Sequence, residues 1–412
     1  MPAPPHCCRW KASAQIIAVS TWLSVGLAAQ KPVNCNAPTL EPSVHLRLPA
    51  GPFTPVATPD GCWVFVPMSD GASGINQGVA VVRRSSGTLR LDRVVPLTSG
   101  GRGATLTHDG KLLIVATGSS VAFLDVGRLT TGAEPAVLGH LAVGADKGAV
   151  YVGVTRNDDL LFVSLEDAAA ILVVDLTRIR NSVFDSTSVL GTIPVGHGPI
   201  ALTFANDDRY LYTTSQVAWA NWAWPVECRP EGADQAAANP LYSQGAVVVI
   251  DVARARTDAA HAVLARAPAG CNPVRLALSP DGNTAWVAAR GSHAVVALDT
   301  RKFLTDPMHA TVARLPVGKA PVGVAVVDEG RRVIATNSDR FAGDSAGRQS
   351  LSVIDVSNGA TNAAVAGFIP AGAFPRELRV TADGRTLLVG NFASKTLQVV
   401  DLRRLAPQKA AP

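Results

Sequence analysis

The stretch GCNPVRLALSPDGNTAWVA, which starts at Gly270, decides the fold because the chain repeats its pattern. A Gly is followed three residues later by a Pro, a short alternating strand, an acidic turn and a second strand. The same pattern begins at Gly196, Gly318 and Gly372, and three weaker copies lie nearer the N-terminus. Self-similarity at a period of roughly 40–50 residues predicts a propeller, a solenoid or an array.

Each copy continues into a third strand, which ends in Asp in six of the seven copies, and every copy but the last continues into a fourth strand. Apolar and polar residues alternate and Asp-Gly turns recur, which predicts antiparallel hairpins. Seven copies of four strands predict an all-β fold, a seven-bladed β-propeller of four-stranded antiparallel blades. The last copy stops after LQVVDL at Leu402, whereas VHLRLPAG at 44–51 is a strand without three before it. We therefore expect the N-terminal strand to complete the last blade, a closure that an open solenoid would not need.

The N-terminus has the features of a targeting segment. Arg9 and Lys11 precede an apolar run from Ala14 to Ala29 that ends in small residues, which predicts a secretory signal peptide over 1–29. The run is short and interrupted by polar residues, so an uncleaved membrane anchor is the weaker alternative. We expect an extracytoplasmic protein, periplasmic or secreted, without an integral span after cleavage. An extension (30–43), the propeller (44–405) and a tail (406–412) would follow.

Composition narrows the class of function. The 412-residue chain is 47% hydrophobic and 17% charged, which indicates a packed body, and its net charge of +5 is scattered. No basic stripe suggests a nucleic-acid partner. The sequence holds no Cys-x-x-Cys-His for haem and no Cys-x-x-Cys pair for zinc or redox chemistry. We therefore assign no cofactor and no metal.

Four cysteines follow the predicted leader, and an even count in an exported chain predicts disulfides with three possible pairings. We define the top face of the propeller as the one carrying the Gly-x-x-Pro turns. Cys228 and Cys271 fall on the top in neighbouring blades, whereas Cys35 and Cys62 fall on the bottom. Bridged Cα atoms lie within about 7 Å of each other. The positions therefore predict the bridges 35–62 and 228–271.

Short motifs at the ends of second strands carry a family resemblance. They read Ile334-Ala335-Thr336-Asn337 and Leu388-Val389-Gly390-Asn391, with a departure at Trp286-Val287-Ala288-Ala289-Arg290. Over 44–405 the chain resembles the YVTN-type β-propeller repeat family, which overlaps the seven-bladed β-propeller lactonase family. The resemblance implies the propeller fold and is far less specific for activity, because this architecture hosts many unrelated functions.

The largest departure from the repeat is an insertion at 216–245 in blade four, on the top face. It contains Trp219, Trp222 and Trp224. One interpretation is an aromatic platform near the channel mouth for a sugar ring, an aromatic group or a partner protein. The alternative is that these indoles pack the loop onto blades four and five.

Polar residues at strand ends form the other candidate site. Arg and carboxylate groups there could bind an anionic or hydroxylated ligand, or they could simply satisfy loop carbonyls. The residues expected near the top face and the channel are His197, Arg275, Arg290, His293, Asn337, Asp339, Arg340, Arg376, Glu377 and Asn391. A calcium site on oxygens from several blades stays open as an alternative. Its candidate ligands are Asp70, Glu166, Asp167, Asp339 and Glu377.

Three functions follow from these features. The first is an exported binding or interaction protein, with a small molecule or a protein bound on the top face near the Trp-rich insertion. The second is a lactonase-type hydrolase with its site at the central channel, although the sequence shows no G-x-S-x-G and no metal-binding His spacing. The third and weakest is a propeller subunit of an electron-transfer assembly. The recurring Asp at third-strand ends is expected to cap the following turn rather than to catalyse.

Overall fold

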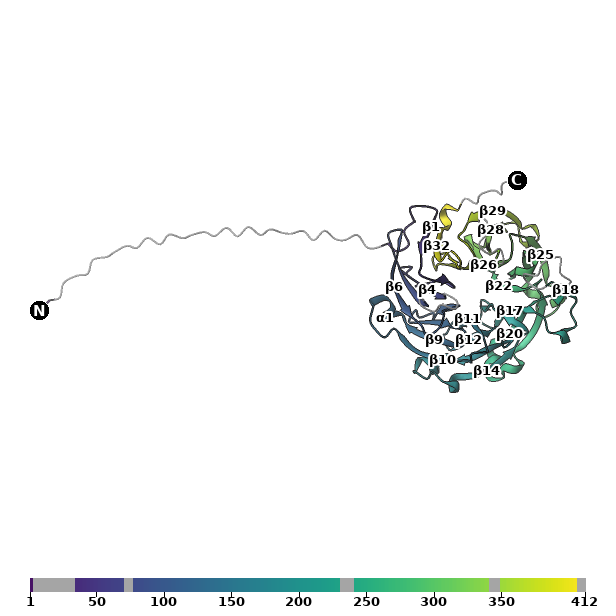
Figure 1. Cartoon of the computed structure of the whole chain (residues 1–412), viewed down its shortest axis with the longest axis horizontal. Coiled ribbons are helices and arrows are strands. Elements are labelled where there is room, and N and C mark those ends of the chain that lie inside the picture. Colours follow the sequence, from purple (N-terminus) through teal and green to yellow (C-terminus); the bar gives the residue numbers. More distant parts are fainter. Residues whose placement is uncertain (3–33, 70–76, 230–240, 341–348, 406–412) are drawn as a thin grey trace. The chain divides into compact units, whose positions relative to one another are not determined.

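Seven small antiparallel sheets surround a central axis (Figure 1). The computed structural model describes residues 1–2, 34–69, 77–229, 241–340 and 349–405. The predicted signal peptide, beyond its first two residues, and the tail at 406–412 lie outside the described residues. The prediction of a seven-bladed propeller of four-stranded blades is confirmed.

The first three blades follow the repeat along the chain. In blade one the first strand is split, and the strands are β2 (Gly51–Pro52), β3 (Val56–Ala57), β4 (Trp63–Ser69), β5 (Gly78–Ser85) and β6 (Thr88–Pro96). Blade two contains β7 (Ala104–Leu106), β8 (Leu112–Ala116), β9 (Ser120–Asp125) and β10 (Val137–Ala142). Blade three contains β11 (Ala149–Val154), β12 (Leu160–Leu165), β13 (Ala170–Asp175) and β14 (Val189–Pro194).

Blade four carries the insertion and also has a split first strand. Its strands are β15 (His197–Pro199), β16 (Thr203–Phe204), β17 (Tyr210–Val217), β20 (Ala246–Asp251) and β21 (Val263–Pro268). The insertion forms its own pair of short strands, β18 (Val226–Cys228) and β19 (Tyr242–Ser243). Blade five contains β22 (Pro273–Leu278), β23 (Thr284–Ala289), β24 (Ala294–Asp299) and β25 (Thr311–Pro316).

The last two blades close the ring. Blade six contains β26 (Pro321–Val327), β27 (Arg332–Asn337), β28 (Ser350–Asp355) and β29 (Ala364–Pro370). Blade seven contains β30 (Pro375–Val380), β31 (Thr386–Asn391) and β32 (Thr396–Asp401), and its fourth strand is β1 (Ser43–Arg47). The predicted closure is confirmed, since β1 pairs antiparallel with β32 and Val44 lies opposite Val399. Figure 1 shows β1 beside β32, although the two strands come from opposite ends of the chain.

The Asp that ends the third strand in blades two to seven caps the segment that follows it, as expected. Asp125 accepts a hydrogen bond from the backbone of Arg128 and so starts α1 (Val126–Thr131). The same contact starts α2 (Leu176–Arg180) and α3 (Val252–Thr257). Side-chain oxygens are good helix caps because they satisfy amide groups that the first turn leaves unpaired. These carboxylates therefore serve the repeat.

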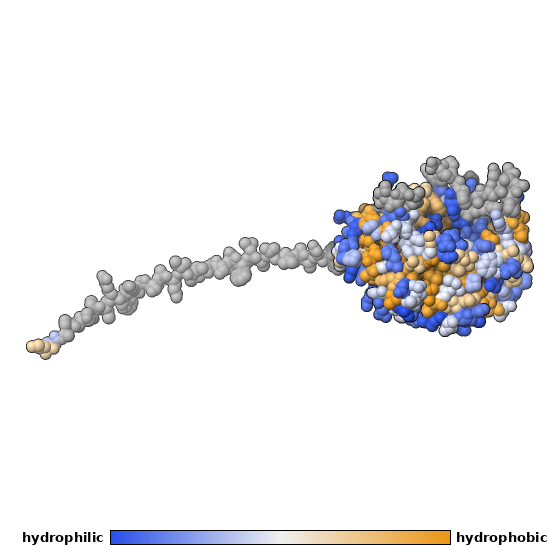
Figure 2. All heavy atoms as spheres, turned by 60° about the horizontal axis from the view of Figure 1, so that its bottom comes forward, coloured by the Kyte–Doolittle hydropathy of each residue, from blue (hydrophilic) through white to orange (hydrophobic). Residues whose placement is uncertain are grey.

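The core lies within and between the blades. Second and third strands are buried almost throughout, with Phe65, Phe123 and Phe162 fully enclosed. On the face shown in Figure 2, hydrophilic and hydrophobic residues are interspersed. Among the described residues, no helix has the length and apolar character needed to cross a membrane.

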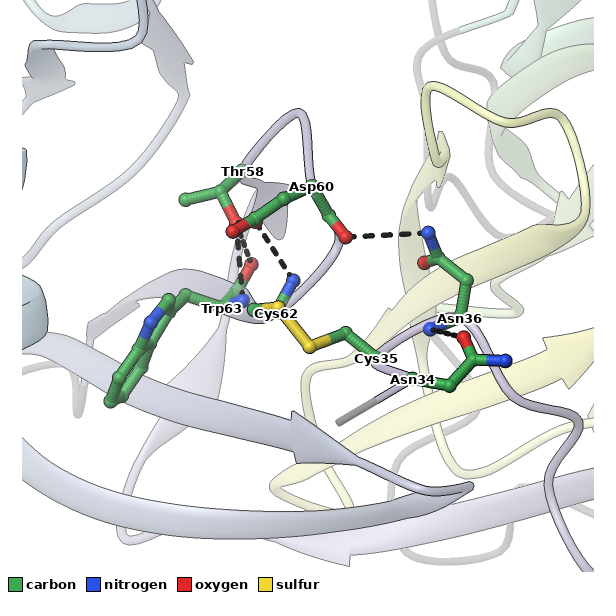
Figure 3. The surroundings of a disulfide bond; sticks show 7 residues. All are labelled: Asn34, Cys35, Asn36, Thr58, Asp60, Cys62 and Trp63. Atoms are coloured by element: carbon green, nitrogen blue, oxygen red, sulfur yellow. Dashed lines mark hydrogen bonds between the residues drawn. A yellow bond between two sulfur atoms is a disulfide. The ribbon is translucent and has the colours of Figure 1, made fainter. Parts of the chain in front are cut away.

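Both predicted disulfides are confirmed, with Cα–Cα distances of 4.8 Å for Cys35–Cys62 and 5.4 Å for Cys228–Cys271. The first ties the N-terminal segment to the bottom hairpin of blade one (Figure 3). Next to it, Asn36 Nδ2 donates to the Asp60 carbonyl at 3.3 Å. The Asp60 side chain in turn accepts from the Cys62 amide at 3.0 Å. The segment that leads into the closing strand is therefore fixed covalently and by hydrogen bonds.

Candidate functional site

One position of the repeat forms a layer of side chains in the channel. Counted from the Pro of the Gly-x-x-Pro turn, it is the second residue along the innermost strand. In copies without that Pro, the count starts from the residue that aligns with it. In blades three, five and seven it follows a register shift between first and second strands. In blade order, the residues at this position are Thr54, Gly103, Tyr151, Ala201, Arg275, Gly323 and Glu377.

Arg275 and Glu377, both expected near the channel, form a buried ion pair across this layer. Arg275 Nε donates to Glu377 Oε2 at 3.2 Å, and Nη2 donates to Oε1. The two side chains are 7% and 1% exposed. The pair spans from blade five to blade seven, with blade six between them. A side chain on Gly323, the equivalent position of blade six, would meet the Arg376 carbonyl and Leu378, so this glycine lets blades six and seven pack closely.

Tyr151 of blade three extends this layer toward the opposite wall. Arg275 Cζ lies 4.4 Å from the centroid of the Tyr151 ring, a distance typical of a cation–π contact. A side chain on Gly103 of blade two would collide with that ring, so the phenol also abuts its neighbouring blade. Glu377, Arg275 and Tyr151 thus form a barrier between an upper and a lower part of the channel.

Arg376 lies above this barrier, where β30 begins. Its Cζ is 4.2 Å from the ring centroid of Phe53, and the rings of Phe374 and Phe392 also face it, at 5.5 and 5.8 Å. Arg376 Nε is buried and has no hydrogen-bond partner within the described part of the chain. Burial lowers the pKa of this guanidinium to about 10, although Glu377 partly opposes the shift.

Further cations surround Arg376 in the upper part. The positive charges that lower its pKa further are those of Arg275, Arg340 and Arg290. Among the described residues, Glu377 is the only carboxylate that shifts the Arg376 pKa, and it is bound by Arg275. The upper part of the channel therefore gathers positive charge around a guanidinium held by aromatic rings.

Three equivalent positions at the tops of second strands form a hydrogen-bonded arc beside this cluster. They are Glu166, Gln216 and Arg290, in blades three, four and five. Gln216 Nε2 donates to Glu166 Oε1 at 3.0 Å, and Arg290 Nη2 donates to Gln216 Oε1 at 2.7 Å. Because Gln216 is the first residue of the insertion, this polar arc links the insertion to the channel mouth.

The three insertion tryptophans form a row of edge-to-face contacts. The ring centroids of Trp219 and Trp222 are 5.9 Å apart, and those of Trp222 and Trp224 are 5.2 Å apart. The row ends at His197, whose ring lies 6.3 Å from that of Trp219. Trp222 and Trp224 pack against the core, yet all three indoles keep some exposed surface. Packing thus explains part of the row, and its role as a ligand platform stays a prediction.

Other candidate residues have structural partners away from this cluster. Asn337 and Asn391 lie within blades six and seven, where their amides bond to the third strand, for example Asn337 Nδ2 to Ser352 Oγ at 3.0 Å. His293 is exposed and its Nδ1 accepts from the Ala320 amide at 3.0 Å. The Asp339 amide donates to a neighbouring carbonyl. A ligand role for these residues stays untested.

The carboxylates considered for calcium do not converge where the structure describes them. Within residues 34–69, 77–229, 241–340 and 349–405, no three His, Cys, Asp or Glu side chains are grouped to hold a metal ion. Asp70 lies outside the described residues.

Sequence reasoning missed two channel residues, Tyr151 and Arg379. Both stand where other copies of the repeat carry small residues such as Ala201, Gly323 and Ala277. Aligning all copies column by column would have marked them as exceptions. Arg379 lies below the barrier and lines a cavity of about 410 Å³.

No family model and no curated protein matches the chain. Among solved structures, a chain of the Kuenenia stuttgartiensis hydrazine synthase matches with a TM-score of 0.62 and 16% identity. The match covers 87% of this chain and 97% of that one. A chain in the crystal structure of the mitotic checkpoint complex has a TM-score of 0.62 and 14% identity, over 94% of this chain and 99% of that one. At these identities the likeness shows the β-propeller fold alone.

Proposed function

We propose that this protein is an exported β-propeller of the YVTN type that binds an anionic ligand or partner on its top face. The site is the upper part of the channel, between Arg376 and the polar arc, with the Trp-rich insertion at its edge. A propeller fold is consistent with an interaction scaffold. The ligand class follows from the charges at the mouth.

The proposal rests on the surroundings of the Arg376 guanidinium. It is half-buried, faces three phenyl rings, and lies near Arg290 and Arg340 as well as the Arg275–Glu377 pair. A buried cation costs free energy unless an acceptor neutralises it. A carboxylate, phosphate or sulfate group would supply charge-assisted hydrogen bonds where they are strongest, away from bulk water.

Binding is favoured over lactone hydrolysis because Glu377, the carboxylate in the channel layer, is paired with Arg275. A hydrolase needs a general base to activate water. Both oxygens of Glu377 accept hydrogen bonds from Arg275, so this carboxylate is already engaged in an ion pair. Lactonase activity nevertheless remains the alternative that the family resemblance implies.

Export is supported by the N-terminal sequence and by the disulfides. Disulfides persist in oxidising compartments and are rare in reducing ones. The Cys35–Cys62 bridge lies shortly after the predicted cleavage region, so the exported chain would keep both cystines. Subcellular fractionation with N-terminal sequencing tests this part, and a cytoplasmic protein with residue 1 intact would contradict it.

Calorimetric titration of the oxidised protein from residue 30 onward tests the binding function. The probes are citrate, galacturonate and a sulfated monosaccharide, with galactose as the neutral control. We expect at least one anionic probe to bind, and Arg376→Gln to weaken it about tenfold or more, since a charge-assisted hydrogen bond contributes roughly 1.5–3 kcal/mol. The matched control is Arg331→Gln, which alters a guanidinium on a bottom hairpin.

Two outcomes would overturn this proposal. One is equal binding of the anions by wild type and Arg376→Gln. The other is turnover of a lactone panel that is lost in Arg290→Ala, which would favour the hydrolase. Quenching of Trp fluorescence by the bound anion, absent in Trp222→Ala, would place the insertion at the site.

A further inference from the structure

A second site lies in the lower part of the channel, separate from the top-face site. The cavity of about 410 Å³ extends from the Arg275–Glu377 pair to the last residues of the innermost strands, toward the bottom face. Its size falls within the range of about 300–1,000 Å³ typical of small-molecule sites. Phe204, Leu278 and Val380 lie at its lower end and keep some exposed surface, so solvent reaches the cavity.

The roof of this cavity offers no net charge to a ligand. Arg275 and Glu377 neutralise each other through two hydrogen bonds. Tyr151 presents its ring beneath them and contacts both Arg275 and Arg379. A ligand that enters from the bottom face would therefore meet a roof without net charge.

Apolar side chains form much of the lower walls, whereas polar atoms contribute a similar share of the surface that lines the cavity. The apolar side chains are aliphatic or aromatic and lie on the innermost strands of blades four to seven: Leu202, Phe204, Leu276, Leu278, Val326 and Val380. Thr203, a polar member of the lining, already donates its hydroxyl to the Leu276 carbonyl at 3.1 Å. The apolar side chains of the lower walls therefore suit a hydrocarbon or aromatic body, while the polar part of the lining suits a polar head.

Arg379 is the exception among these apolar side chains. Its Cζ lies 5.3 Å from the Tyr151 ring centroid, and Nη1 donates to the Leu378 carbonyl at 3.2 Å. No carboxylate within the described part of the chain pairs with it. Burial lowers the pKa of this guanidinium to about 10, so it is still protonated near neutral pH. The cavity thus contains a half-buried guanidinium that no carboxylate of the described residues neutralises.

We propose that the lower cavity binds a small monocarboxylate with an apolar body, its carboxylate on Arg379 and its body along the apolar walls. A guanidinium presents two parallel N–H groups that match the two oxygens of a carboxylate. Apolar surface on the ligand would be buried against Phe204, Leu278 and Val326. A compact dianion such as phosphate lacks that body and would bring an excess negative charge.

Calorimetric titration of octanoate into the oxidised protein tests the assignment. Octanol serves as the uncharged analogue, and inorganic phosphate as the anion without an apolar body. We expect octanoate to bind with 1:1 stoichiometry, and octanol and phosphate to bind at least about tenfold more weakly, in line with the loss of one charged hydrogen-bond pair.

Matched variants on the same strand locate the site. Arg379→Gln should lower the affinity for octanoate about tenfold or more. Arg376→Gln, which removes a similarly half-buried guanidinium above the barrier, should leave the octanoate affinity unchanged. Val326→Phe, which fills the cavity while Arg379 is kept, should also reduce binding. Circular dichroism checks that each variant is folded. If Arg379→Gln does not fold, Val326→Phe still tests whether octanoate binds in the lower cavity.

Any of three results overturns the proposal. These are octanol binding as tightly as octanoate, octanoate affinity unaffected by both lower-cavity variants, and octanoate affinity lost in Arg376→Gln but not in Arg379→Gln. The last would assign octanoate to the top-face site, so failure of this inference is distinguishable from failure of the proposed function.

Discussion

Arg376 and Arg379 lie three residues apart on β30, and burial lowers the pKa of each to about 10. Their surroundings nevertheless differ. Arg376 lies among three phenyl rings and near other charges, above the layer formed by Tyr151, Arg275 and Glu377. Arg379 lies below this layer in a cavity whose lower walls carry apolar side chains. Burial alone does not define a binding site, because neighbours determine which ligand would stabilise the buried charge.

The largest expected effect comes from breaking the layer that separates the two arginines. Glu377→Leu leaves the Arg275 guanidinium buried without its counter-charge, and we expect the free energy of unfolding to fall by about 3–5 kcal/mol. Urea denaturation followed by circular dichroism measures it. The double variant Arg275→Met/Glu377→Leu removes both charges and should recover most of the loss. A double variant as unstable as the single one would contradict this account of the pair.

The second prediction uses a covalent link on the upper side. Cys228→Ser/Cys271→Ser removes the bridge between the insertion and the blade-five turn, and should lower the free energy of unfolding by about 2–4 kcal/mol. It should also lower the affinity of the top-face site for its anionic ligand, because the insertion is no longer tied to blade five. Octanoate affinity should not change. The opposite pattern, with octanoate weakened and the top-face ligand unaffected, would refute our separation of the two sites.

The third prediction compares the two guanidiniums directly. Replacing Arg379 by Met removes an unpaired buried charge, and we expect unfolding to cost about 1–2 kcal/mol more at pH 7. Arg376→Met should gain less, because it also loses contacts with three phenyl rings, each typically worth about 0.5–1 kcal/mol. Thermal and urea unfolding of both variants measures the difference.

The pH dependence of the Arg379→Met effect has a defined sign. An arginine whose folded pKa of about 10 lies below its unfolded value destabilises the fold fully below pH 10. This penalty is lost as pH rises through the folded pKa, because the unfolded chain then binds more protons. The advantage of Arg379→Met should therefore shrink by about 1 kcal/mol between pH 8 and pH 11. A constant advantage would show that desolvation of charge is not its cause.

The fold could be predicted because each blade repeats the same short sequence motifs. Asp-Gly hairpins and Gly-x-x-Pro turns mark each blade, and the unpaired strand at Val44 can only complete the last one. The same sorting of faces predicted both disulfides. These features need no knowledge of how side chains meet across the channel.

The site was less predictable because it depends on contacts between blades. Arg275 of blade five reaches Glu377 of blade seven across the intervening blade, a relation that becomes visible only when the repeats are arranged around the channel. Asn391 looked like a channel residue at the end of its strand. Its amide instead bonds to Gln398 on the adjacent strand, at 3.2 Å. Arg379 was missed because nothing near it in sequence distinguishes its surroundings from those of Arg376.

The smallest expected effect comes from the polar arc. Gln216→Ala removes the amide that joins Glu166 to Arg290 and should lower the free energy of unfolding by about 0.5–1.5 kcal/mol. Gln216→Glu keeps an acceptor for Arg290 but places a carboxylate against Glu166. It should therefore weaken top-face anion binding more than Gln216→Ala does, because the added negative charge repels the ligand while its size is conserved. Octanoate binding should be equal in both variants, since the arc lies on the other side of the Arg275–Glu377 barrier. If calorimetry finds both ligands weakened alike, the two parts of the channel are one site.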